Sequence, residues 1–313
     1  MRTNGRPLIV ACLILCPVSV LSAQDLAPRA YVISPVHSNA VILTYSHIGG
    51  SLDFEGAVPI TGATATINLP VISYYHTLNF FGRTANITVG VPYGIGNFQG
   101  IVSEAPKHAY RSGLLDSFVR FSVNLKGGPS MKPTEFAKWQ QKALLGASLK
   151  IVAPTGQYDP TSLINWGNNR WAFKPEFGYS QRWGHWILDG YAAVWFFTTN
   201  PEFFSHNNYY PGVQVQTEKP IGAFEGHLSY DIRPRLWLSL DGNFWFGGKI
   251  SLNAIENPVT QQKSSRIGIT GSMPLTKHQS IKISYSKGTY ISYGGNYSNV
   301  SLAWQYAWIG WPK

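Results

Sequence analysis

The strongest constraint on the fold is the segment from 170 to 197, where two stretches alternate apolar and polar side chains. From 170 to 182 the odd positions are mainly aromatic, and the even positions include Lys174 and Glu176. From 185 to 198 the even positions are apolar, and the odd positions include Asp189. A period of two is the signature of a β-strand with one apolar face. Each arm exceeds the five or six residues of an ordinary strand and reaches the roughly nine to eleven that a tilted strand needs to cross a bilayer. The segment therefore predicts a transmembrane β-hairpin.

Such a hairpin requires further strands, because unpaired backbone groups at its edges would each cost several kcal/mol in hydrocarbon. The predicted strands are 40 to 47, 70 to 80, 83 to 91, 114 to 125, 141 to 152, 170 to 182, 185 to 198, 220 to 232, 235 to 248, 264 to 274, 278 to 288 and 297 to 308. The fold class is therefore predicted to be all-β, a closed antiparallel transmembrane β-barrel of about twelve strands.

The connections separate this fold from a soluble β-sandwich, which would also alternate but with its apolar face inward. Short turns alternate with long segments at 48 to 69, 92 to 113, 153 to 169, 199 to 219, 249 to 263 and 289 to 296. Outer-membrane barrels have short periplasmic turns and longer extracellular loops. One connection, 126 to 140, is long where a short one is expected. We predict a short helix there, capped by Thr134, with Phe136 and Trp139 on one side, either resting on the barrel rim or serving as a periplasmic docking element.

The first residues predict export. Arg2 and Arg6 precede an apolar run from 8 to 21, which is too short for a membrane anchor. We predict a signal peptide over 1–23, cleaved after about Ala23, a periplasmic N-terminal segment over 24–39 and a barrel over 40–313. Both cysteines, Cys12 and Cys16, lie within the signal, so disulfides and thiolate metal sites are excluded from the exported chain.

Composition supports a bacterial outer-membrane location. The formal net charge is +10, but the basic residues are scattered, which argues against nucleic acid as a partner. No apolar run of the length of a transmembrane helix follows the signal. The expected partners are outer-membrane lipid, a small-molecule permeant and the outer-membrane assembly machinery, which reads an alternating aromatic last strand. Either Trp308 or Trp311 is the terminal aromatic residue of that strand.

Several motifs also resemble a known family. They are the run from Ala153 to Pro160, the run from Ile164 to Glu176, and shorter stretches at 188–191, 195–197, 224–230 and 293–297. This pattern is similar to that of outer-membrane transporters associated with the meta-cleavage pathway of phenol degradation. The resemblance covers most of the exported chain and implies a barrel that passes small molecules, aromatic or otherwise hydrophobic.

Charged residues on the polar face are the candidate pore lining. Barrel closure turns that face inward, so side chains from neighbouring strands meet in the lumen. The set is Arg120, Lys150, Lys174, Glu176, Asp189, Glu225, His227 and Asp241. Two interpretations remain open: a salt-bridged polar core, or a pore lining that sets selectivity. The loop from 154 to 170 is either a surface loop or a gate at the mouth.

The function predicted from the sequence is passive diffusion of small molecules through a polar lumen, without catalysis, cofactor or metal. One alternative is a structural or adhesive barrel, suggested by the aromatic loop residues Phe203, Phe204, Tyr209 and Tyr210. An outer-membrane lipase is the other, with His37-Ser38-Asn39 supplying the residue types of a triad. That run precedes the first strand, on the expected periplasmic side, and no G-x-S-x-G or H-E-x-x-H motif occurs. His227 near Glu225 and Asp231 is better explained as a structural histidine than as a metal ligand.

Overall fold

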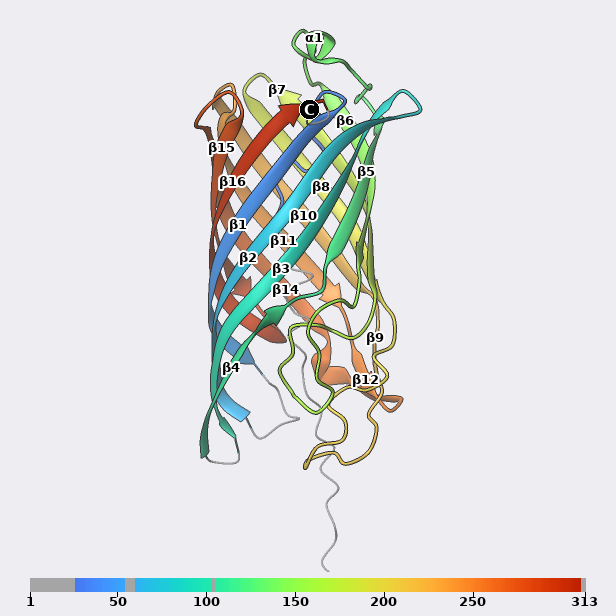
Figure 1. Cartoon of the computed structure of the whole chain (residues 1–313), viewed down its shortest axis with the longest axis vertical. Helices are drawn as coiled ribbons and strands as arrows, with labels where there is room; N and C mark the ends of the chain where they lie inside the picture. The colour runs from blue at the N-terminus through green and yellow to red at the C-terminus, as the bar shows by residue number, and fades with distance from the viewer. Residues whose placement is uncertain (1–25, 54–59, 103–104, 311–313) are drawn as a thin grey trace, which may run out of the picture.

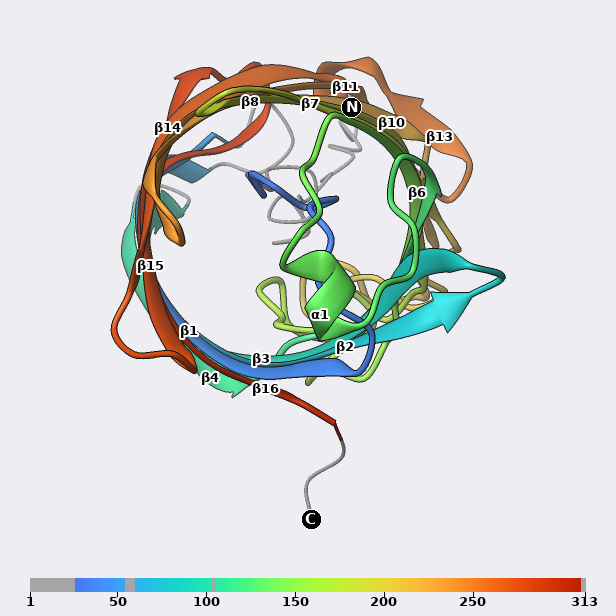
Figure 2. The ribbon, with the colours of Figure 1, turned by 90° about the horizontal axis from the view of Figure 1, so that it is seen from above.

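The computed structural model describes residues 26–53, 60–102 and 105–310, so the predicted signal peptide lies outside the described residues. Twelve strands form a closed antiparallel barrel (Figures 1 and 2). In order around the wall they are β1 (Ser38–Asp53), β2 (Ile60–Phe80), β3 (Arg83–Val102), β5 (Phe118–Lys126), β6 (Ala143–Val152), β7 (Ala172–Trp183), β8 (Trp186–Phe197), β10 (Ile221–Arg233), β11 (Leu236–Gly247), β14 (Gln262–Pro274), β15 (Gln279–Tyr290) and β16 (Gly294–Ile309). Strand β16 pairs with β1 from Ser38↔Ile309 to Asp53↔Gly294 and closes the ring.

The apolar face of the strands points outward. Phe196, Leu238 and Ile283 are 46%, 49% and 52% exposed, whereas Lys174 and Glu225 on the other face are buried. An outward apolar surface around a polar interior is the arrangement of a transmembrane barrel and the reverse of a sandwich. The predicted fold class and the direction of both faces are therefore confirmed.

This arrangement predicts the cost of a charge on the outer face. Leu240 lies near the middle of β11 and is 63% exposed. Leu240→Arg should lower the free energy of unfolding by about 2 to 4 kcal/mol, because it places a guanidinium in hydrocarbon. Urea unfolding in lipid vesicles measures the change. Val213→Arg is the matched control, since Val213 is also exposed but lies in a loop. Equal unfolding of the two variants would contradict a lipid-facing β11.

The two ends of the barrel differ in their connections, as predicted. Turns of two residues join β7 to β8 and β10 to β11, and Phe81 and Gly82 join β2 to β3 with φ of 50° and 77°. A left-handed residue lets such a turn follow the twist of its strands. These turns and the C-terminal end of β16 lie together, and we call this the short-turn end (top of Figure 1). The opposite end is the long-loop end.

The strands β1 to β3 are longer than expected and replace two predicted loops. Residues 48–69 belong largely to the continuing β1 and β2, and 92–113 to β3 and a further strand, β4 (Ala105–Leu114), that pairs with β3. Those loop predictions were wrong because a hydrogen-bonded ladder does not need to stop where the lipid ends. The connection expected over 289–296 is also short, since β15 ends at Tyr290 and β16 begins at Gly294.

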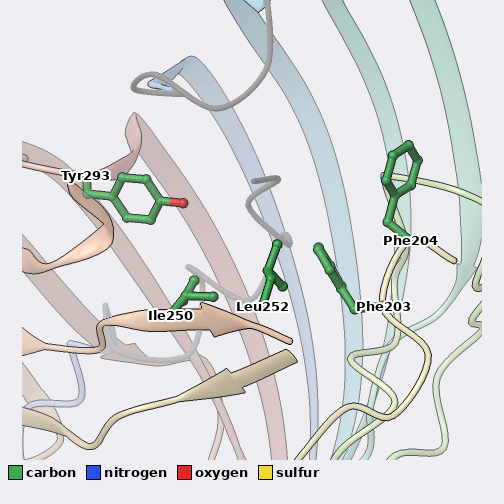
Figure 3. Packing of buried hydrophobic residues seen from close by; sticks show 5 residues of the cluster. All are labelled: Phe203, Phe204, Ile250, Leu252 and Tyr293. Atoms are coloured by element: carbon green, nitrogen blue, oxygen red, sulfur yellow. The ribbon is translucent and has the colours of Figure 1, made fainter. Parts of the chain in front are cut away.

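Loops at the long-loop end fold into a small apolar core of their own. The elements there are β9 (Gln216–Glu218), β12 (Ile250–Leu252), β13 (Ile255–Asn257) and the 3-10 helix Pro258–Thr260. Phe203 and Phe204 pack with Ile250, Leu252 and Tyr293 (Figure 3). We call these five residues the loop cluster. Phe203 and Phe204 are therefore buried, which corrects the expectation that they are exposed for adhesion, whereas Tyr209 is 60% exposed.

The predicted short helix exists as α1 (Pro133–Phe136) at the short-turn end. Its N-cap is Lys132 rather than Thr134, because Pro133 occupies the first helical position, which its fixed φ favours. The Lys132 N–H donates to Glu135 at 2.8 Å. The rings of Phe136 and Trp139 stack, as expected, with centroids 6.0 Å apart. Among the described residues no helix is long and apolar enough to cross a bilayer.

Candidate functional site

The described N-terminal residues, 26–37, run inside the barrel (Figure 2). We call them the lumenal segment. Tyr31 and Ile33 of this segment are buried. Leu26 lines a cavity bounded by strands β1, β14, β15 and β16. The Val36 N–H donates to the Met131 carbonyl at 2.9 Å. The expectation of a periplasmic segment over 24–39 did not include this path, and the boundary at residue 39 stays a prediction. The lumenal segment therefore occupies part of the space inside the barrel.

Tyr31 anchors the lumenal segment on two glycines. It is 1% exposed, and its hydroxyl donates to Glu176 Oε1 at 2.9 Å and lies 3.1 Å from Ser148 Oγ. A Cβ at Gly146 or Gly178 would come within 2.2 Å or 2.1 Å of the ring. Burial and the neighbouring carboxylate raise the pKa of Tyr31, so it stays a neutral phenol that can donate to Glu176.

Arg29 ties the same segment to the wall through charge. Its Nη1 lies 2.7 Å from Asp231 Oδ1, while Arg182 Nη1 lies 2.7 Å from Asp231 Oδ2. The backbone N–H of Arg29 donates to Asp189 Oδ2 at 3.2 Å, and its guanidinium lies 4.3 Å from the centre of the Trp237 ring. The lumenal segment is therefore bound to the wall by two side chains, the phenol of Tyr31 and the guanidinium of Arg29.

Four of the candidate residues form a chain of ion pairs across β5, β7 and β10. Glu176 Oε1 accepts from Arg120 at 3.2 Å, and its Oε2 lies 3.0 Å from Lys174 Nζ. Lys174 Nζ lies 3.1 Å from Glu225 Oε1. Glu176, Lys174 and Glu225 are each less than a tenth exposed. Paired charges at this depth satisfy one another, which matches the salt-bridged core interpretation.

Two more candidates continue this chain onto β11. His227 Nε2 lies 3.5 Å from Glu225 Oε2, and His227 Nδ1 lies 2.8 Å from Asp241 Oδ1. Asp241 also accepts from Ser239 at 2.7 Å and from Thr270 at 2.6 Å. The connected set, which we call the ion network, consists of Arg120, Glu176, Lys174, Glu225, His227 and Asp241.

The remaining two candidates also face inward but make other contacts. Lys150 Nζ lies 4.7 Å and 5.6 Å from the ring centres of Phe118 and Trp195. Asp189 accepts a hydrogen bond from the backbone N–H of Arg29. All eight predicted residues therefore reach the lumen from the polar face, and a role for them in selecting a permeant stays a prediction.

The part of the inner wall that begins next to Asp241 and runs from β14 to β1 is lined by small hydroxyl side chains. Strands β1, β14, β15 and β16 surround a cavity of about 220 Å³. We call it the lumen cavity. Its lining includes Thr44, Thr270, Ser284, Ser301 and Asn299, together with Leu26 of the lumenal segment, Asp241 at the end of the ion network, and Lys282. Open space in the barrel therefore lies against this wall.

The loop from 154 to 170 is held at the long-loop end by one buried acid. Asp116 accepts from the Gly156 N–H at 2.9 Å and from the Asn168 N–H at 2.8 Å. Burial raises the pKa of Asp116 against these hydrogen bonds. Trp166 is 5% exposed and packs against Phe98. The loop is thus folded onto the wall, and gating by it stays a prediction.

Arg29, Tyr31 and Lys282 are among the lumen residues that were missing from the candidate set. Arg29 and Tyr31 lie before the first strand, where alternation carries no information about position. Lys282 had a usable signal, because it shares the polar parity of β15 with Ser284 and Ser286. Selecting every charged residue on the inward parity would have added Lys282 to the candidate set.

Two residues of the lipase alternative, His37 and Asn39, contact groups other than Ser38. Ser38 begins β1 at the short-turn end, and Asn39 donates to the Gly310 carbonyl at 2.7 Å and accepts from Tyr74 at 2.6 Å. His37 faces the His76 ring, with centroids 6.4 Å apart. Within the described residues, no group of three or more His, Cys, Asp or Glu side chains is placed to hold a metal ion.

Sequence comparison identifies the family. The model described as "Putative MetA-pathway of phenol degradation" matches residues 44–302. The chain belongs to this family. The match runs from β1 into β16, so it covers the ion network, most of the wall and most of the lining of the lumen cavity, but not the lumenal segment. It confirms the resemblance seen in the motifs. Comparison with curated proteins found no match.

Solved structures share the fold at low sequence identity. The COG4313 outer membrane channel from Pseudomonas putida F1 is similar with a TM-score of 0.73 and 14% identity, over 91% of this chain and all of that one. The β domain of the Bordetella autotransporter Brka is similar with a TM-score of 0.52 and 10% identity, over 87% of this chain and all of that one. Both likenesses establish the fold of an outer-membrane barrel.

Proposed function

We propose that this family member is an outer-membrane channel through which small molecules diffuse passively. The observation that supports this most directly is the lumen cavity, a space of about 220 Å³ with polar lining inside a closed wall whose outer face is apolar. A polar interior that admits solutes is how barrel channels carry molecules across lipid. The proposed mechanism uses no catalytic group, metal or cofactor.

The orientation follows from the connections. Outer-membrane barrels place short turns in the periplasm and long loops outside the cell, so α1 and the C-terminal end of β16 face the periplasm. The last strand presents Trp304, Tyr306 and Trp308 in alternation, and we propose that the assembly machinery reads it. Trp311, the other candidate terminal aromatic, lies outside the described residues, as does the proposed cleavage site after Ala23.

Small aromatic molecules are the proposed permeants. The family description refers to phenol degradation, which concerns compounds with a flat ring and one or two polar groups. The lumen cavity offers hydroxyl groups for the polar part and Leu26 for the ring. Larger sugars should pass poorly, because the lumenal segment and the loop cluster both reduce the space through which a solute can diffuse.

Liposome swelling tests this proposal. Vesicles with the wild-type barrel should swell faster than empty vesicles in phenol, benzyl alcohol and benzoate, and slowly in trisaccharides. A variant without residues 26–33 keeps the strands and serves as the positive control. If neither protein swells vesicles faster than the empty control in any solute, passive diffusion is refuted.

A non-transporting structural or adhesive barrel is the second candidate. The observation that favours it is the double obstruction, with Tyr31 held against one wall and the loop cluster packed at the long-loop end. A swelling rate that rises only in the variant without residues 26–33 would favour this candidate, because the wild-type lumen would then be closed at rest.

A further inference from the structure

Lys282 differs from three other cations that face the lumen, Arg29, Arg120 and Lys174. It lines the lumen cavity and remains exposed to that space. Within the described part of the chain, its Nζ makes no hydrogen bond or ion pair. Arg29, Arg120 and Lys174 are each bound to a carboxylate. A primary ammonium with open space before it has room for an anion from solution.

The acid nearest to Lys282 is buried and bound to other side chains, and it forms no ion pair with Lys282 among the described residues. Asp241 is the acid that lines the same cavity, and its two oxygens accept from His227, Ser239 and Thr270. Glu225, on β10, is bound to Lys174. Of the two charged groups in this lining, Lys282 is exposed to the cavity and Asp241 is buried.

The surroundings of Lys282 supply the rest of a carboxylate site. Ser284 and Ser301 stand opposite each other on β15 and β16, one inward position further along the wall from Lys282, and both line the cavity with Thr44 and Asn299. Hydroxyl and amide groups donate to carboxylate oxygens, and hydrogen bonds to a charged group are about twice as strong as neutral ones. Leu26 covers one side of the cavity with apolar surface.

From this arrangement we infer that Lys282 forms an anion-binding subsite in the lumen, which binds the carboxylate of a small organic acid on its way through. The inference rests on the proposed channel function and adds to it a charge preference. The ion network binds the carboxylate of Asp241, and Lys282 with its neighbouring hydroxyls selects anions over cations and over neutral molecules of the same size.

Reversal potentials in planar bilayers under a KCl gradient test this preference. The wild-type barrel should be anion-selective, Lys282→Gln should lose most of that preference, and Lys282→Arg should keep it. The matched control is Lys287→Gln, which removes a lysine from the same strand on the opposite parity, outside the lumen. If Lys282→Gln and Lys287→Gln have the wild-type reversal potential, the subsite does not exist.

A binding measurement keeps the inference testable without conduction. Calorimetric titration of the folded barrel in detergent uses benzoate as the probe and benzyl alcohol as its neutral counterpart. Benzoate affinity should fall by about tenfold or more in Lys282→Gln, as expected for one lost charged hydrogen bond, while the behaviour of benzyl alcohol stays the same. A wild-type barrel that binds benzoate but conducts nothing would refute the channel and keep the subsite. Conduction with equal benzoate affinity in both proteins would refute the subsite alone.

Discussion

Tyr31→Ala is expected to increase the single-channel conductance strongly. Deleting a buried aromatic ring costs about 3 to 5 kcal/mol. Here the ring holds the lumenal segment to the wall by packing on Gly146 and Gly178 and by the hydrogen bond of its hydroxyl to Glu176. Each 1.4 kcal/mol changes a population about tenfold, so the docked state should fall by roughly a hundredfold or more relative to the released state. Planar-bilayer recording measures the result, with the variant lacking residues 26–33 as the upper reference. Tyr31→Phe keeps the ring and should resemble the wild type.

A substitution in the barrel wall should also release the lumenal segment. Gly178→Val would place a Cβ about where the Tyr31 ring lies, 2.1 Å from its nearest atom, so the ring must leave although the segment is unchanged. Gly190→Val is the matched control, because nothing lies within 4 Å of a Cβ at Gly190. We expect Gly178→Val to match Tyr31→Ala in conductance and Gly190→Val to match the wild type. Unchanged conductance in both Tyr31→Ala and Gly178→Val would show that the segment does not limit flow.

Lys174→Met is expected to cause the largest loss of stability. It removes the cation between Glu176 and Glu225. Among the described residues, Glu225 then keeps only His227 as an ion-pair partner. Breaking a buried ion pair by removing one partner costs about 3 to 5 kcal/mol, because the remaining charge is buried without compensation. The urea midpoint for loss of the compact band on an unheated gel should fall accordingly.

Two variants separate this effect from the loss of any lysine. Lys263→Met makes the same substitution on the exposed parity of β14 and should unfold like the wild type. Lys174→Met combined with Glu225→Gln removes the stranded charge and should recover much of the loss. If the single and the double variant unfold at the same urea concentration, the ion network does not carry the stability assigned to it.

Side-chain alternation made most of the wall predictable. A strand with an apolar parity and a polar parity has only one orientation compatible with lipid outside, so Phe224 and Leu238 had to face outward and Glu225 and Asp241 inward. Ring closure then brings inward residues on neighbouring strands together. The contact between His227 and Asp241 follows from that rule, because the two residues are direct partners in the ladder between β10 and β11.

Features without period-two information could not be predicted in the same way. The lumenal segment has no strand pattern, and the seat of Tyr31 depends on glycines that come from β6 and β7, more than a hundred residues later in the chain. The outer parts of β2 and β3 alternate small residues, such as Ala63 and Ala65 with Thr64 and Thr66, so their two faces differ little in polarity. The burial of Phe203 depends on a neighbouring loop rather than on its own sequence.

The unequal length of the strands makes the long-loop end uneven, and in the proposed orientation this end faces out of the cell. Strands β2 and β3 contain 21 and 20 residues, about twice what a bilayer crossing requires, so a stiff ridge with β4 at its edge stands beside the entrance. Across from it lie the folded loops around β9 and β12 (Figure 1). In the proposed orientation, a phage tail or an antibody would meet this ridge and these loops before it reached Lys282 and the lumen cavity.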